Sequence, residues 1–166
     1  IRLARSAGVH MHTHLCEGEN SSMVRRFGVR SLEWCRRIGF VGSDIWLAHG
    51  RETLPGEYAL LAENHMGISH CPAPTMLGGS EILDIPGMRK AGIPISLGVD
   101  GCATNDGSNM LDTLRLAYLM QTFLSKKRGG CPSPSEMLKL ATVGGAEMIG
   151  RPELGQLAAG KAADLF

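Results

Sequence analysis

Four short apolar segments alternate with helical patterns along this chain, and this alternation constrains the fold more than any other feature. The strand candidates are residues 8–15, 44–48, 67–70 and 93–99. Helical patterns cover residues 30–38, 57–65, 82–91, 110–125 and 135–149. Strands that alternate with helices form parallel βαβ units. We therefore predict an α/β protein whose crossovers fit one half of a (β/α)8 barrel, with an open doubly wound sheet as the competing architecture.

A residue suited to catalysis or metal binding stands at the end of each strand candidate. These residues are His14, His49, His70 and Asp100. In (β/α)8 barrels the active-site residues lie at the carboxyl ends of the strands and in the loops that follow them. The pattern at all four ends favours the barrel over the open sheet, and it predicts one active site at that edge.

Three histidines lie two residues apart at the end of the first strand candidate. His10, His12 and His14 would share one face of a strand, because strand side chains alternate between faces. Burying three imidazoles is costly unless they bind something or pair. Glu17 follows at the mouth of the strand, so a metal ligand and a proton carrier could flank one small molecule. A polar strand end with hydrogen-bonded histidines is the alternative interpretation.

The other strand ends allow both a functional and a structural interpretation. A carboxylate such as Asp100 after a core strand needs a compensating charge or a metal, whereas the glycine that follows it also suits an Asx turn. His49 follows an apolar run, where a lone histidine is often structural. His70 is interpreted as a pocket-lining residue, and Cys71 beside it would point to the opposite face, so no dyad is expected. Ser108 or Asn109 is the predicted N-cap of the helix that follows.

The composition argues against several classes of protein. The 17 Lys and Arg residues nearly balance the 16 Asp and Glu residues, for a net charge of +1. Proteins dedicated to nucleic acids or membrane surfaces carry a basic excess, which this chain lacks. No apolar stretch reaches the roughly 20 residues that span a membrane. Five scattered cysteines without a Cys-x-x-Cys pair favour a reducing, cytoplasmic environment.

Taken together, these motifs resemble the amidohydrolase superfamily, in its branch of metal-dependent deaminases and chlorohydrolases. His14-Leu-Cys-Glu17 is similar to the His-x-x-Glu of that branch's fifth strand, and His49 matches its sixth-strand histidine. Gly98-Val-Asp100 matches its eighth-strand aspartate. The resemblance implies that residues 1–150 are the C-terminal half of the barrel, strands 5 to 8. It also implies that residues 151–166 begin a strand of the family's small β-sandwich.

The motif His12-Thr-His14 also resembles the His-x-His of the family's first strand, but the spacing assigns it to the fifth. Only two strand candidates lie between this motif and Asp100, where a first-to-eighth assignment needs six. We therefore expect the first four strands, with two of four metal ligands, to lie outside this chain. His14 and Asp100 are the implied remaining ligands of one divalent metal ion, zinc in preference to iron. The chain by itself is expected to be inactive.

The resemblance implies hydrolytic deamination of an amino-substituted, oxo-bearing heterocycle similar to 8-oxoguanine or guanine. Asp100 would take the proton of the attacking water, Glu17 would protonate a ring nitrogen, and His49 would orient the water or stabilise the tetrahedral adduct. His70 and Asn105 are the expected substrate-binding residues. The alternatives are an s-triazine aminohydrolase or chlorohydrolase on the same site and, in another class, a non-catalytic association module. The intact protein is expected to be a cytoplasmic homo-oligomer that acts on a small molecule.

Overall fold

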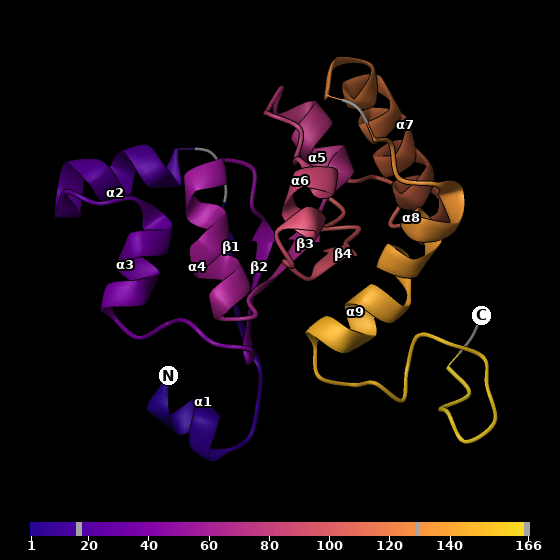
Figure 1. Ribbon diagram of the computed structural model, residues 1–166, viewed down its shortest axis with the longest axis horizontal. Coiled ribbons are helices and arrows are strands. Elements are labelled where there is room, and N and C mark those ends of the chain that lie inside the picture. Colours follow the sequence, from indigo (N-terminus) through magenta and orange to yellow (C-terminus); the bar gives the residue numbers. More distant parts are fainter. Residues whose placement is uncertain (16–17, 129, 165–166) are drawn as a thin grey trace.

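A four-stranded parallel sheet forms the centre of the computed structural model, which describes residues 1–15, 18–128 and 130–164 (Figure 1). The strands are β1 (Met11–Leu15), β2 (Ile45–His49), β3 (Gly67–His70) and β4 (Ile95–Leu97). They lie in the order β1-β2-β3-β4, and all neighbouring pairs are parallel. An order that follows the chain without reversal is that of a barrel and lacks the switch point of a doubly wound sheet. The predicted half barrel is therefore confirmed.

Helices follow each strand and surround the sheet. They are α1 (Arg2–Ser6), α2 (Glu19–Phe27), α3 (Ser31–Arg37), the 3-10 turn η1 (Pro55–Glu57), α4 (Tyr58–Glu63), α5 (Pro72–Leu77), α6 (Ile85–Lys90), α7 (Met110–Arg128), α8 (Pro134–Ala141) and α9 (Val143–Met148). Figure 1 shows the chain advancing from α2 and α3 at one end of the molecule, through the sheet, to α7 and α8 at the other. Among the described residues, no helix has both the length and the hydropathy needed to cross a membrane.

The sequence patterns predict no helix over α1, α2 or α5. Helix α2 is polar, but it gains a packing partner because Phe27 stacks on Trp34 of α3 with ring centroids 4.2 Å apart. Helix α5 begins at Pro72, a residue that reads as a turn in the sequence but is well tolerated in the first turn of a helix, where its missing N–H leaves no bond unmade. Tertiary packing therefore stabilises α2 in spite of its polar sequence, and the position of Pro72 in the first turn makes it compatible with α5.

The C-terminal helical pattern is divided in two. The predicted helix over 135–149 breaks at Thr142, whose φ of −125° and ψ of −90° separate α8 from α9. Helix α8 is capped as its sequence predicts, because the Ser133 hydroxyl accepts a bond from the Glu136 N–H and the Glu136 carboxylate accepts one from the Ser133 N–H. Residues 151–164 form turns and contain no strand. The start of a β-sandwich strand in 151–166 thus stays a prediction.

The two faces of the sheet differ sharply in polarity. One face packs on the helices through residues that are at most 6% exposed: Ile45, Leu47, Ile68, Ile95 and Leu97. The register pairs His12 with Trp46, His14 with Ala48, and Ser69 with both Ala48 and Ser96, which places these residues on the opposite face. In a closed barrel that polar face is the interior.

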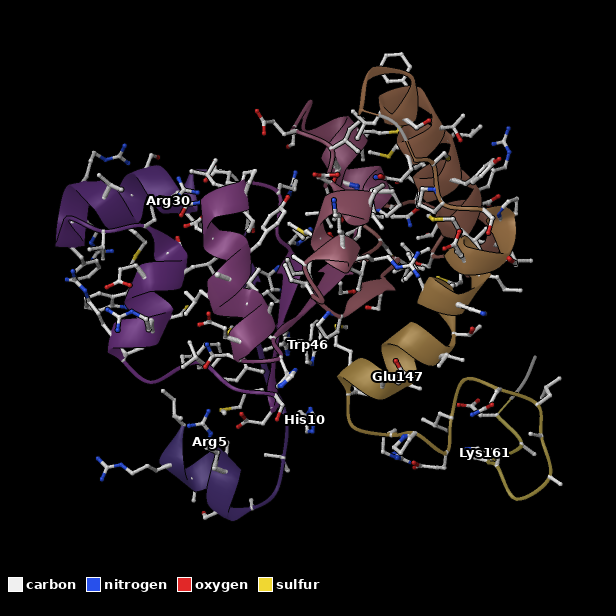
Figure 2. The ribbon with its side chains drawn as sticks, viewed as in Figure 1. Arg5, His10, Arg30, Trp46, Glu147 and Lys161 are labelled. Atoms are coloured by element: carbon white, nitrogen blue, oxygen red, sulfur yellow. The ribbon has the colours of Figure 1, made fainter. Side chains whose placement is uncertain are left out.

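Helix α9 lies at the amino-terminal end of the strands. The sulfur of Met148 is 3.6 Å from the Ser96 hydroxyl, and a Cβ added to Gly67, the first residue of β3, would collide with the Met148 side chain. A Cβ on Gly150 would lie 2.6 Å from the ring of His10, which precedes β1 and lies near α9 in Figure 2. The end of the half barrel opposite the predicted active site is thus covered by α9 and the turn that follows it.

Candidate active site

The carboxyl ends of the four strands bring His14, His49, His70 and Asp100 to one edge of the sheet. His14 is the penultimate residue of β1, His49 and His70 are the last residues of β2 and β3, and Asp100 follows β4 by three residues. Parallel strands end at the same edge, so these four residues lie along it as predicted. Their individual roles stay predictions.

His14 and His49 are in direct contact. The Nε2 atom of His49 lies 3.1 Å from the Nδ1 atom of His14, and the ring centroids are 5.0 Å apart. Strict alternation would point His49 to the helix side of the sheet, with Leu47. Instead its backbone adopts φ of +69°, a left-handed conformation that is rare outside glycine and that redirects the ring. Residues held in such conformations cluster at functional sites, where their surroundings fix them.

The environment of His49 favours a neutral imidazole. The residue is 2% exposed, and within the described part of the chain its Nδ1 atom has no hydrogen-bond partner. Burial is the main cause that lowers the pKa of His49, and the positive charge of Arg51 lowers it further, whereas Asp100 acts in the opposite direction. A neutral imidazole next to a carboxylate can accept a hydrogen bond from a water molecule or donate one to it.

Asp100 is held by its own loop. Its φ is +63°, again left-handed, and the Thr104 hydroxyl donates to Oδ2 over 2.9 Å. Burial acts to raise the pKa of Asp100, but the hydrogen bonds from the Gly101 backbone and from Thr104, with the charges of His49 and His14, together lower it. These contributions favour the ionised form of Asp100.

His70 is the most deeply buried of the four strand-end residues. It is completely buried, and neither ring nitrogen has a hydrogen-bond partner among the described residues. Burial, with smaller contributions from His49 and Arg51, lowers the pKa of His70 to about 4. By strand alternation it shares the helix-facing side with Ile68, so its predicted contact with substrate stays untested.

Asn105, the second expected substrate-binding residue, has a contact that explains its position in structural terms. Its side-chain amide donates to the Val99 carbonyl over 2.8 Å and reaches the Thr113 hydroxyl at 3.4 Å. These bonds join the loop after β4 to α7. Its role in substrate binding stays a prediction. Asn109 caps α7 as expected, because its Oδ1 accepts from the Leu111 N–H over 2.9 Å.

Glu17, the predicted proton donor to the substrate, lies outside the described residues. The described residues that follow it are bound to the next loop: the Gly18 N–H and the Asn20 side chain both donate to Glu52, over 3.1 and 2.7 Å. The loop after β1 is therefore joined to the loop after β2, beside His49. His12, two residues before His14 on the same face of β1, stacks on Trp46 with ring centroids 4.4 Å apart.

Two residues that the sequence did not single out support the site. Thr104 binds Asp100, and a threonine four residues after a strand-end aspartate was the only signal for it. Arg51 follows His49 by two residues and is fixed by Ser80, whose hydroxyl accepts from the guanidinium over 2.6 Å. A cleft of about 620 Å³ lies beside the site and not on it, and is lined by Asn20, Arg25, Arg51, Glu52 and Glu81 among others.

The side chains fit a partial site for a divalent metal. Imidazole and carboxylate are ligands that zinc takes in catalytic sites. Because Nδ1 of His14 contacts His49, a metal would bind its Nε2 atom, and His49 would fix the tautomer and orientation of that ligand. No cluster of three or more metal-binding side chains exists in residues 1–15, 18–128 and 130–164. His14 and Asp100 stay the predicted metal ligands of this chain.

Comparison with known proteins relates the whole chain to one protein family. The model of the amidohydrolase family matches residues 1–166. The chain is 52% identical over 166 residues to the hydroxydechloroatrazine ethylaminohydrolase of Pseudomonas sp. (strain ADP). The alignment covers 99% of this chain and 34% of that protein. It is 40% identical over 161 residues to the 8-oxoguanine deaminase of Pseudomonas aeruginosa, with 95% and 35% covered.

A solved structure agrees with these relatives. The atrazine chlorohydrolase of Arthrobacter aurescens in complex with zinc superposes with a TM-score of 0.89 at 32% identity, over 98% of this chain and 36% of that one. The chain therefore spans about a third of the length of the proteins it matches.

Proposed function

Since this chain belongs to the amidohydrolase family, we propose that the full-length protein containing it hydrolyses an amino-substituted, oxo-bearing heterocycle and releases the amine. The observation that carries the proposal is the contact of His14 with His49 beside the carboxylate of Asp100, all at the carboxyl edge of the sheet. Such an edge is where barrel enzymes place their catalytic groups.

We propose that His14 and Asp100 hold one divalent metal ion, zinc in preference to iron, together with two ligands from strands outside this chain. Zinc also accompanies the related chlorohydrolase of Arthrobacter aurescens. The metal would lower the pKa of a bound water toward about 7. His49 supports this role by occupying Nδ1 of His14.

The residues of this chain divide the proton transfers between them. Asp100 takes a proton from the attacking water, and its lowered pKa keeps it ionised until then. Glu17 delivers a proton to the ring nitrogen, and His49 orients the water or stabilises the adduct. Water adds to the amino-bearing carbon, the C–N bond breaks, the amine leaves, and a C=O group remains.

Two substrate classes deserve a direct comparison. A purine such as 8-oxoguanine or guanine is the first candidate, supported by the motifs around Asp100 and by the 40% identity to an 8-oxoguanine deaminase. A hydroxy-s-triazine is the second, and the 52% identity to a hydroxydechloroatrazine ethylaminohydrolase favours it. Dechlorination of a triazine on the same site is the remaining variant of this reaction. Both rings are flat and carry amino and oxo groups.

The chain by itself is proposed to be inactive, because it supplies only two of the four expected ligands. The intact protein is proposed to be a cytoplasmic homo-oligomer with a small-molecule substrate and neither nucleic acid nor membrane as a partner. A purely structural or association role is the competing class, and it predicts that the site residues are dispensable.

The deciding experiment measures zinc content and amine release by the full-length protein with 8-oxoguanine, guanine and hydroxytriazines. We expect about one metal per chain and turnover of one of these classes. Asp100→Asn and His14→Asn should abolish turnover, whereas Asp106→Asn and His65→Asn, at exposed positions, should retain it. Full activity of the first pair, or a wild-type protein without metal and without amine release, would overturn the proposal.

A further inference from the structure

The loop after β4 contains a hydroxyl group that binds the carboxylate of Asp100. The Thr104 Oγ1 atom donates to Oδ2 of Asp100 over 2.9 Å and lies 3.1 Å from the Gly101 carbonyl. The hydroxyl has one proton, and the bond to the charged carboxylate is the stronger of the two. Thr104 is half-buried, so water competes with this bond only in part.

The backbone around Thr104 makes this bond part of a fixed turn. The N–H groups of Thr104 and Asn105 both donate to the Gly101 carbonyl over 3.0 Å. The Asn105 side chain then binds the Val99 carbonyl, on the other side of Asp100 in the sequence. Asp100, in its left-handed conformation, is thus enclosed by a turn that is anchored on both sides.

The position of Thr104 determines what remains open on the carboxylate. Oδ2 already accepts a hydrogen bond, while the charge of Asp100 is felt by both His14 and His49. A carboxylate rotates freely about its terminal torsion unless a neighbour holds it. The Gly101 backbone bonds to the carboxylate as well, and the threonine hydroxyl adds the side-chain hold on Oδ2. The β-branched side chain of Thr104 has few rotamers in which to move away.

We propose that Thr104 is a positioning residue that locks the rotation of the Asp100 carboxylate, so that one oxygen is presented to the metal and to the attacking water. This inference rests on the proposed function, because it assigns Thr104 a part in that same site. Partners of this kind, which orient a metal-binding carboxylate, typically contribute 10- to 100-fold in metal affinity or activity.

The test compares Thr104→Val with Thr104→Ser in the full-length protein. Valine keeps the shape and removes the hydroxyl, whereas serine keeps the hydroxyl and removes a methyl group. Zinc affinity is measured by competition with a chromogenic chelator, and kcat and KM are measured with the substrate that the wild type hydrolyses. Thr122→Val is the matched control, because its hydroxyl binds only groups remote from the site, the Tyr118 carbonyl and the Cys131 sulfur.

We expect Thr104→Val to weaken zinc binding roughly 10- to 100-fold and to lower kcat by a similar factor with little change in KM. Thr104→Ser should stay within about threefold of the wild type, as should the Thr122→Val control, on the same scale of effects. If Thr104→Val does not fold, judged by its thermal unfolding, Thr104→Ala replaces it with the same expectation.

Other results overturn the inference. Wild-type zinc affinity and kcat in Thr104→Val would show that the hydroxyl positions nothing, and the proposed function would stand. An equal loss in Thr104→Ser would show that the methyl group matters and the hydroxyl does not. A wild-type protein that binds no zinc and releases no amine would instead remove the proposed function.

Discussion

The Nε2 atom of His49 lies 3.1 Å from the Nδ1 atom of His14. This contact between the two imidazole rings links the carboxyl ends of the neighbouring strands β1 and β2. This contact exists because His49 departs from the alternation of β2 by taking a φ of +69°. The backbone conformation and the chemistry of the site are therefore coupled at one residue.

Replacing His49 should separate the contribution of its imidazole ring to catalysis from the contribution of its left-handed backbone to stability. Asparagine tolerates the left-handed region, so His49→Asn should fold normally and lose roughly 10²- to 10⁴-fold in kcat, the range of a general acid–base group. A β-branched residue at this φ is strained, so His49→Val should also lower the unfolding temperature. Steady-state kinetics and thermal unfolding of both variants check this. Equal kcat in His49→Asn and the wild type would contradict the assigned role.

The stability of the protein should fall in acid because of His70. Burial lowers the pKa of His70 to about 4, below the ordinary value of 6.5. Between these two values the unfolded state binds more protons than the folded one, so stability is lost as the pH falls through this window. The free energy of unfolding should drop by about 3 kcal/mol between pH 7 and pH 4 from this residue.

Denaturant titrations of the full-length protein at pH 7 and at pH 4.5 test the contribution of His70. His70→Asn should be less stable at pH 7 but should show a smaller loss between the two pH values. Met88→Leu, a change at a buried position without a titratable group, should leave the pH dependence as in the wild type. An unaltered pH dependence in His70→Asn would show that the acid sensitivity lies elsewhere.

The close approach of Gly67 and Met148 should appear as a strong coupling between the two positions. Gly67→Ala introduces a Cβ where the Met148 side chain lies, and overpacking of this kind costs about 1–3 kcal/mol. Met148→Ala alone should cost about 2–5 kcal/mol through the cavity it leaves. The double variant should be more stable than the sum of the two single effects predicts. Strict additivity in denaturant unfolding would mean that the two residues are not in contact.

The capping box of α8 gives a smaller, local prediction. Ser133→Ala removes the acceptor for the Glu136 N–H and should lower the free energy of unfolding by about 1 kcal/mol. Ser133→Asp retains an acceptor and should stay close to the wild type. Urea unfolding monitored by circular dichroism distinguishes the two variants, and equal stability of alanine and serine would indicate that α8 needs no cap.

The sequence predicted the parts of the fold that rest on apolar periodicity. The predicted strand candidates 8–15 and 93–99 contain β1 and β4, and His14 and Asp100 then had to lie at one edge because parallel strands share a direction. Helix α2 escaped prediction because its stability comes from the stacking of Phe27 on Trp34, a contact outside its own pattern. The break at Thr142 likewise depends on how α9 packs under β4, which no local signal reports.

At the site, the sequence predicted that the strand-end residues lie near one another, but it did not predict where their side chains point. The left-handed conformations of His49 and Asp100 decide where the two side chains point, and single residues in that region leave no periodic signature. The bond from Thr104 to Asp100 also arises from a turn in which the N–H groups of Thr104 and Asn105 both donate to the Gly101 carbonyl. Such features follow from tertiary geometry alone.

The order of the strands has a consequence for the width of the site. His14 belongs to β1 and Asp100 follows β4, the two outer strands of the described sheet, which in a flat sheet would lie about 14 Å apart. Yet the charge of His14 contributes to the pKa of Asp100. The curvature of a barrel sheet brings strands that are three apart closer together than a flat sheet would. A spectroscopic distance between positions 14 and 100 would therefore report how far the barrel is closed. Any ligand or subunit contact that straightens the sheet would pull these two proposed metal ligands apart.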